Sequence, residues 1–201
     1  MHWTEILGQP MPKKFGGHPA LELCNTGAGW HEPMRPEFEW IRSYDRLAIW
    51  AWYQDHITET QREELRAGAQ NNPAEAADAL AEFRELRDAL YPILTHEEHG
   101  HEFDTVSAIA QRASQQMQLV RLDNGLAQWR IPHAKVLELP VLVAAASAAE
   151  LLCSHLRNRV KACPGNDCGW LFIDARGRRR WCSMASCGNR AKARAYAKRQ
   201  S

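Results

Sequence analysis

Four of the six cysteines in the sequence lie within its last forty residues, in two pairs with the same internal spacing. Each pair has four intervening residues, and thirteen residues separate the second cysteine from the third. Two such pairs can place four thiolates around one tetrahedral ion, the coordination that Zn²⁺ takes in closed structural sites. We therefore predict one structural zinc ion, bound by no histidine and ligated by Cys163, Cys168, Cys182 and Cys187.

Disulfide bonds and simply buried thiols are the alternatives to a metal site. Disulfides need an oxidising compartment, and the first 23 residues show no signal peptide, since prolines and glycines interrupt them and no apolar core is present. No apolar run reaches the ~18 residues that a membrane span needs. We therefore expect a cytoplasmic chain with reduced thiols. Four cysteine ligands would leave no open coordination position on the metal, so we expect no enzyme.

Charge is distributed unevenly along the chain. Residues 157–201 contain twelve Lys or Arg against two acids, a formal +10, whereas residues 1–156 contain 13 Lys or Arg against 22 acids, a formal −9. Four zinc-bound thiolates and the dication would lower the net charge of residues 157–201 only from +10 to +8. A solvated face that merely offsets the thiolate charge would need far fewer cations. The imbalance therefore favours a polyanionic partner, and nucleic acid in particular.

The residues around the cysteines resemble the CGNR zinc finger, which is named for its last cysteine and the three residues after it. Here these are Cys187-Gly188-Asn189-Arg190, preceded by Cys168-Gly169-Trp170 and Arg180-Trp181-Cys182. The front of the chain is similar to the ABATE domain that usually precedes this finger. The resemblance implies a stress-induced bacterial transcription regulator that binds DNA. It also implies a sensing role for the front domain, with Asn25 and Thr26, after an expected first strand, as contacts to a small effector.

The finger is expected to be a β-hairpin and a helix around the metal, as in ribbon or treble-clef sites. We predict strands at 170–173 and 180–182, a turn between them that holds four arginines, and a helix from about Cys187. Within the helix, basic residues recur every four positions and form one stripe. The residues predicted to contact DNA are Arg178, Arg179, Arg180, Arg190, Lys192, Arg194 and Lys198.

The chain is predicted to be an α+β protein with two parts, a mainly helical domain at 1–156 with a small antiparallel sheet, and the finger at 157–201. Hydrophobic periodicity and capping signals give most of the elements. In order, they are a strand at 18–25, a helix after Ser43, a helix at 59–69, a helix from Ala74 that ends or kinks near Pro92, a helix capped by Asp104, a hairpin with a type I′ turn at Asn124-Gly125, and a helix from Pro140 to about Val160.

Two other functions remain open from the residues alone. The finger could bind RNA or a partner protein, because zinc sites of this kind serve all three purposes. The front domain could also be an enzyme that the finger delivers to its target. The His-rich tract at 96–101 is interpreted as a solvent loop, since it lacks helical ligand spacing. A homodimer is compatible with the sequence.

Overall fold

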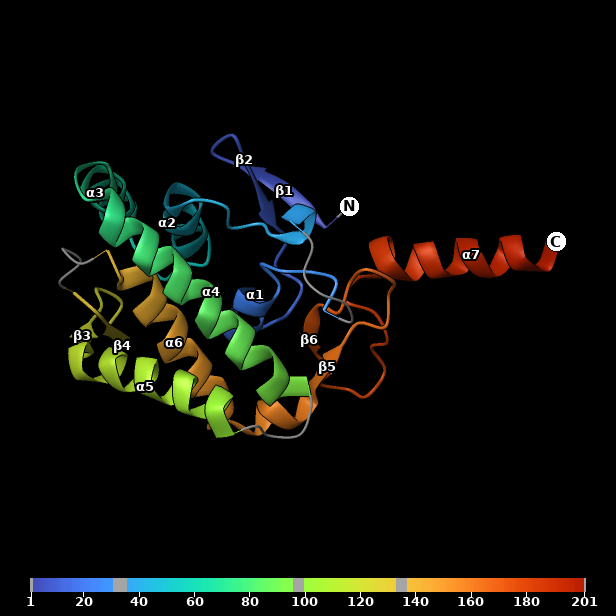
Figure 1. Ribbon diagram of the computed structural model, residues 1–201. Coiled ribbons are helices and arrows are strands. Elements are labelled where there is room, and N and C mark those ends of the chain that lie inside the picture. Colours follow the sequence, from blue (N-terminus) through green and yellow to red (C-terminus); the bar gives the residue numbers. More distant parts are fainter. Residues whose placement is uncertain (1, 31–35, 96–99, 133–136, 201) are drawn as a thin grey trace. The chain divides into compact units, whose positions relative to one another are not determined.

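The chain packs as two units, and the two ends of the sequence belong to the same one. Unit 1 consists of Met1–Trp40 and Leu151–Ser201, and unit 2 of Ile41–Glu150. The computed structural model describes residues 2–30, 36–95, 100–132 and 137–200 (Figure 1). Most of this part is helical, with three two-stranded antiparallel sheets, which confirms the predicted α+β class. These two packing units differ from the two domains predicted from the sequence, 1–156 and 157–201, and that domain division stays a prediction.

Unit 2 is built from helices whose apolar faces form its core. Leu47 and Trp50 of one helix and Phe83, Leu86 and Leu90 of another are fully buried. No helix of the described part of the chain is long and apolar enough to cross a membrane. The helices begin and end as follows: α2 Tyr44–Tyr53, α3 Glu59–Asn71, α4 Pro73–Thr95, α5 Gly100–Gln116 and α6 Leu139–Leu152.

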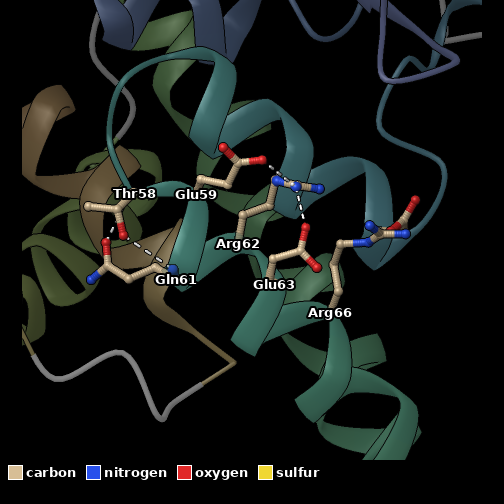
Figure 2. Close-up of polar contacts among 7 residues, drawn as sticks. Thr58, Glu59, Gln61, Arg62, Glu63 and Arg66 are labelled. Atoms are coloured by element: carbon tan, nitrogen blue, oxygen red, sulfur yellow. Dashed lines mark hydrogen bonds and ion pairs between the residues drawn. The ribbon is translucent and has the colours of Figure 1, made fainter.

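The first helices of unit 2 begin where capping residues predict. Ser43 accepts a hydrogen bond from the Arg46 N–H and caps α2. Figure 2 shows the start of α3, where the Thr58 hydroxyl accepts from the Gln61 N–H at 3.2 Å and the Gln61 side chain accepts from the Thr58 N–H at 2.9 Å. This reciprocal pair is a capping box, which satisfies two backbone donors that a helix otherwise leaves free.

Charged side chains then fix α3 against α2 within unit 2. Arg62 is almost fully buried and forms ion pairs with Glu59 and Glu63 (Figure 2). Its guanidinium also lies over the Trp52 ring, 5.4 Å from the ring centroid. Arg66, one turn later, forms an ion pair with Asp45 at the start of α2. The buried cation is therefore tied to two carboxylates, as its desolvation requires.

Two predicted helix ends of unit 2 differ from those in the structure, and a third prediction is not tested. Helix α4 continues through Pro92 to Thr95, because Tyr91, Ile93 and Leu94 are buried and their packing compensates for the lost backbone bond. Asp104 lies inside α5, which begins at Gly100 rather than at a cap on Asp104. Residues 96–99 of the His-rich tract lie outside the described residues.

The predicted hairpin is confirmed, but its turn type was wrong. Strand β3 (Gln118–Arg121) pairs with β4 (Ala127–Arg130), and Leu119 faces Trp129. A type I′ turn needs positive φ at both central residues, and only Gly125 has it, at +83°. The Asn124 side chain accepts a hydrogen bond from the Leu126 N–H at 3.0 Å. This bond stabilises the loop with Asn124 outside the positive-φ region and Gly125 inside it.

The last helix of unit 2 is shorter than predicted. Helix α6 ends at Leu152, and Ser154 then caps a 3₁₀ turn, η2 (His155–Arg159), by accepting from the Leu156 N–H at 3.1 Å. The predicted helix to Val160 was therefore wrong, since the serine side chain offers the backbone an alternative partner. Cys153 is exposed, whereas Cys24 is buried.

Unit 1 starts with a hairpin and a short helix. Strand β1 (Trp3–Ile6) pairs with β2 (Gln9–Pro12), and α1 spans Pro19–Cys24. The strand expected at 18–25 was therefore wrong. His18 caps the helix by accepting from the Ala20 N–H, and Pro19 occupies a position where a helix loses no bond to proline. A 3₁₀ turn, η1 (Pro36–Phe38), precedes unit 2.

The finger contributes one short sheet and one helix to unit 1. Strand β6 (Leu171–Ile173) pairs with β5 (Val160–Ala162), not with 180–182 as predicted. The other edge of β6 is occupied, because Gly16 accepts from the Ile173 N–H and the Asn25 side chain bonds both polar groups of the Leu171 backbone. A π-helical turn, η3 (Met184–Gly188), leads into α7 (Asn189–Gln200), close to the predicted helix start.

Candidate zinc centre

The four cysteines of the finger come together in the buried centre of unit 1. They are each at most 2% exposed and share one apolar cluster with Ala28, Trp170 and Phe172. All are free thiols. The Cys182 sulfur lies 3.7 Å from the sulfurs of Cys168 and of Cys187. A tetrahedral ion with Zn–S bonds of about 2.3 Å spaces its sulfurs about 3.8 Å apart, so these thiols have the separation that zinc requires.

A histidine that sequence reasoning missed lies beside the same cluster. The His2 Nε2 atom is 3.3 Å from the Cys187 sulfur and 3.5 Å from the Cys182 sulfur. The ligand atoms of His2, Cys168, Cys182 and Cys187 all lie within 4.8 Å of one another, and this group could hold one metal ion. Nothing in the sequence pairs His2 with cysteines more than 160 positions away.

Cys163 belongs to the same buried cluster as the other three cysteines and is itself fully buried. With His2 beside it, the cluster offers five candidate ligands. The four-cysteine ligand set remains our proposal, with His2 beside it.

The loop inside the first cysteine pair requires a glycine. A Cβ atom on Gly165 would lie 2.9 Å from the Cys187 sulfur, closer than real contacts allow. The Gly165 carbonyl also accepts from the Cys168 N–H at 3.1 Å, which closes the turn between the two cysteines. The backbone at Gly165 can approach the metal position only because no side chain intervenes.

The last cysteine is the one that the surroundings favour as a thiolate. Hydrogen bonds from the thiols of Cys163, Cys168 and Cys182 lower the pKa of Cys187, and His2 adds to the effect. Arg190 donates from Nη2 to the Cys187 sulfur at 3.1 Å. Arg190 was predicted to contact DNA, and the structure places its guanidinium on the cysteine cluster.

Of the three arginines of the turn that were predicted to contact DNA, one is engaged within unit 1 and two are exposed. Arg179 donates to the carbonyls of Phe15, at 2.6 Å, and of Cys182, and its guanidinium lies 4.5 Å from the Phe172 ring centroid. Its side chain therefore holds the turn to the rest of unit 1, a role that sequence reasoning missed. Arg178 and Arg180 have exposed side chains.

Asp174 organises this turn through the backbone. One carboxylate oxygen accepts from the N–H groups of Arg178 and Arg179, at 2.9 and 3.1 Å, and the other pairs with Lys161 at 2.6 Å. The Lys161 contact, followed by these backbone bonds, lowers the pKa of Asp174 to about 2. The carboxylate therefore stays charged across the physiological range and keeps the turn in place.

Comparison with known families accounts for nearly all of the chain. A model described as "Putative stress-induced transcription regulator", named ABATE, matches residues 17–155, and the CGNR zinc finger model matches residues 159–200. The chain belongs to the ABATE family. Its C-terminal part is a CGNR zinc finger, which confirms the resemblance and identifies the bound metal as zinc, one ion for the cysteine cluster. No curated protein matches the chain.

The ABATE part does not place Asn25 and Thr26 where an effector could reach them. Both residues are 0% exposed. The Asn25 amide accepts from the Leu171 N–H at 2.7 Å and donates to the Leu171 carbonyl at 3.0 Å, while the Thr26 hydroxyl donates to the Leu23 carbonyl at 2.7 Å. Asn25 thus joins the end of α1 to the finger, and Thr26 bonds back onto α1, so the structure leaves neither predicted effector contact exposed.

Proposed function

We propose that this ABATE-family protein is a cytoplasmic transcription regulator that binds duplex DNA through the finger, with one structural zinc ion. The contacts are assigned to the exposed arginines of the turn and to α7. In this proposal zinc holds the turn and the start of α7 in fixed positions, and four cysteine ligands leave it no open position for catalysis.

The observation that carries this proposal is the composition of α7. Its twelve residues include five Lys or Arg and no acid, and none of them is buried. Arg190, Arg194 and Lys198 follow one another at four-residue intervals, where like charges destabilise a helix. A helix of this length is marginal in water unless something covers it. A polyanion would both neutralise these charges and supply the missing contact surface.

Duplex DNA fits this helix better than double-stranded RNA. An α-helix enters the major groove of B-DNA, whereas the deep major groove of A-form RNA excludes side chains. The alanines between the basic residues of α7 are small enough to let its backbone approach the bases. Single-stranded RNA and an acidic partner protein are the competing ligands, and the binding experiment must include both.

The sensing role implied by the ABATE family is assigned to unit 2. A hollow of about 460 Å³ lies among α2, α3 and α4, with Tyr44 and Leu80 in its wall and the Arg66–Asp45 ion pair on its lining. This volume lies within the range of small-molecule sites. We propose it as the place to look for an effector, since Asn25 and Thr26 are buried.

The test is the salt dependence of DNA binding by the zinc-loaded full chain. If Arg178, Arg180, Lys192, Arg194 and Lys198 meet phosphates, log Kd should change with log salt with a slope of magnitude about 4.5. Lys192→Ala and Arg194→Ala should each lower that magnitude by about one. Arg130→Ala, which removes an exposed arginine from unit 2, is the matched control and should leave it unchanged. A flat salt dependence, or tighter binding to single-stranded RNA or an acidic protein, would contradict the proposal.

A further inference from the structure

Five candidate ligands surround a metal that takes four, so one of them must have another role. Cys163 is fully buried in the same cluster as the other three cysteines. His2 is only half-buried, and its nitrogen contacts the sulfurs of Cys182 and Cys187. Distances of 3.3 and 3.5 Å between His2 Nε2 and these sulfurs are within reach of a hydrogen bond to sulfur. We assign the histidine outside the ligand set because the four cysteines form two pairs of equal spacing and are all buried, whereas His2 is partly exposed.

The net charge of the zinc-loaded site explains why a hydrogen-bond donor beside the sulfurs would be stabilising. Four thiolates and one Zn²⁺ carry a net charge of −2, and the sulfurs lie in a cluster that solvent does not reach. A buried charge is costly unless hydrogen bonds or opposite charges compensate it. Arg190 supplies one such contact, at 3.1 Å from the Cys187 sulfur. His2 approaches the same sulfur.

The position of His2 is set by packing at the start of the chain. Its ring lies edge-on to Trp170, with 4.8 Å between ring centroids, and also contacts Phe15 at 6.3 Å. Trp170 is itself fixed, because its indole N–H donates to the Gly27 carbonyl at 2.7 Å. These contacts aim the His2 nitrogen at the sulfurs of Cys182 and Cys187.

We propose that His2 donates a hydrogen bond to the zinc-bound thiolates of Cys187 and Cys182 and, together with Arg190, stabilises the charge of the zinc site. The inference rests on the four-cysteine site proposed above. It makes His2 a positioning residue of the metal site, although it lies far outside the finger in sequence. Hydrogen bonds of this kind typically change metal affinity by about 10- to 100-fold.

The experiment separates the hydrogen bond from the packing of the ring. His2→Phe keeps an aromatic ring against Trp170 but removes the N–H, whereas His2→Gln restores a donor. His155→Ala, which removes an exposed histidine from the same unit, is the control. Each full-length variant, without a tag at the N-terminus, is measured in two ways: the rate of zinc transfer to a chromogenic chelator, and the visible absorption spectrum after Co²⁺ substitution.

We expect His2→Phe to lose zinc about tenfold faster, with the Co²⁺ spectrum of four sulfur ligands unchanged, and His2→Gln to recover most of the loss. Zinc release from His2→Phe at the wild-type rate would show that only packing matters and would overturn the proposal. A changed Co²⁺ spectrum in His2→Phe, with zinc retained by Cys163→Ser, would make His2 a ligand and would also overturn it. Neither measurement depends on DNA binding, so failure here is distinct from failure of the DNA proposal.

Discussion

Glu22 is a carboxylic acid buried in unit 1, where its charge is costly. Its Oε1 atom accepts from the Gly16 N–H at 2.7 Å, and the residue is 4% exposed. Burial raises the pKa of Glu22 from 4.5 to about 7, and the hydrogen bonds from Gly16 and Asn25 offset only part of that effect. The neutral acid is therefore the form that the fold prefers.

This carboxyl predicts a pH-dependent stability of unit 1. Because the pKa is higher in the folded state, the stabilisation is complete below pH 4.5 and is lost as the pH rises through about 7. The full difference corresponds to about 3 kcal/mol. Glu22→Gln should remove this pH dependence. The melting temperature of the mutant minus that of the wild type should therefore rise as the pH is raised from 5.5 to 8. The exposed Glu5→Gln is the control, and a constant difference across this range would refute the prediction.

The buried hydrogen bonds of the Asn25 side chain lead to a second prediction at the residue scale. Its side chain bonds both polar groups of the Leu171 backbone in a buried position. Asn25→Ala leaves these two groups without their partner and should lower the free energy of unfolding by about 2–4 kcal/mol. Chemical denaturation of the zinc-loaded protein measures this. Asn158→Ala, on an exposed turn of the same unit, should cost little. A similar cost in both variants would contradict the assigned role.

At the scale of elements, α7 differs from every helix of unit 2. Helices α2 to α5 each bury at least one apolar side chain, whereas α7 buries no residue and carries only positive charge. Its start is fixed by the buried part of η3, which holds Cys187. Beyond that anchor, its helical form depends on local propensity and on its partner.

Reversing one charge of α7 should separate its folding from its binding. Arg194→Glu creates an i,i+4 pair with Lys198 in the favourable order, worth about 0.3–0.5 kcal/mol, and ends the repulsion along the stripe. Circular dichroism should show equal or higher helix content without DNA, while DNA affinity falls at least tenfold. Arg130→Glu should change neither. If DNA affinity survived the reversal, α7 would not be the contact surface.

At the scale of the molecule, unit 1 is built from both ends of the sequence. The Gly29 N–H donates to the Cys168 carbonyl at 3.0 Å, the Trp170 indole to the Gly27 carbonyl, and Arg179 to the Phe15 carbonyl. Residues before position 41 thus supply backbone partners and apolar contacts that the finger lacks by itself. Unit 2 is inserted between these two parts of unit 1.

This arrangement predicts how the protein responds to loss of zinc. Cys182→Ser, or removal of zinc by a chelator, should increase hydrogen exchange in residues 2–30 as well as in 160–188, because both segments share one core. Exchange in α4 and α5 should change little, since their core lies in unit 2. Exchange mass spectrometry of the full chain measures both. An increase confined to 160–188 would show that the finger folds independently.

The sequence by itself determined the features that depend on local pattern. The spacing of the cysteines indicated the metal, the 3.6-residue periodicity indicated the helices of unit 2, and alternation around Asn124-Gly125 indicated the β3–β4 hairpin. The excess of cations after residue 157 favours a polyanionic partner, which stays a prediction. Each of these signals lies within a short segment, so no knowledge of distant contacts was needed.

Only the tertiary structure decided the features that join distant segments. Asn25 and Leu171 are 146 positions apart, and their pairing turns an expected effector contact into a structural one. The same is true of Arg179, which bonds Phe15, and of His2, which reaches the cysteine cluster. A side chain's role depends on which partners surround it once it is buried, and local sequence carries no information about partners from the other end of the chain.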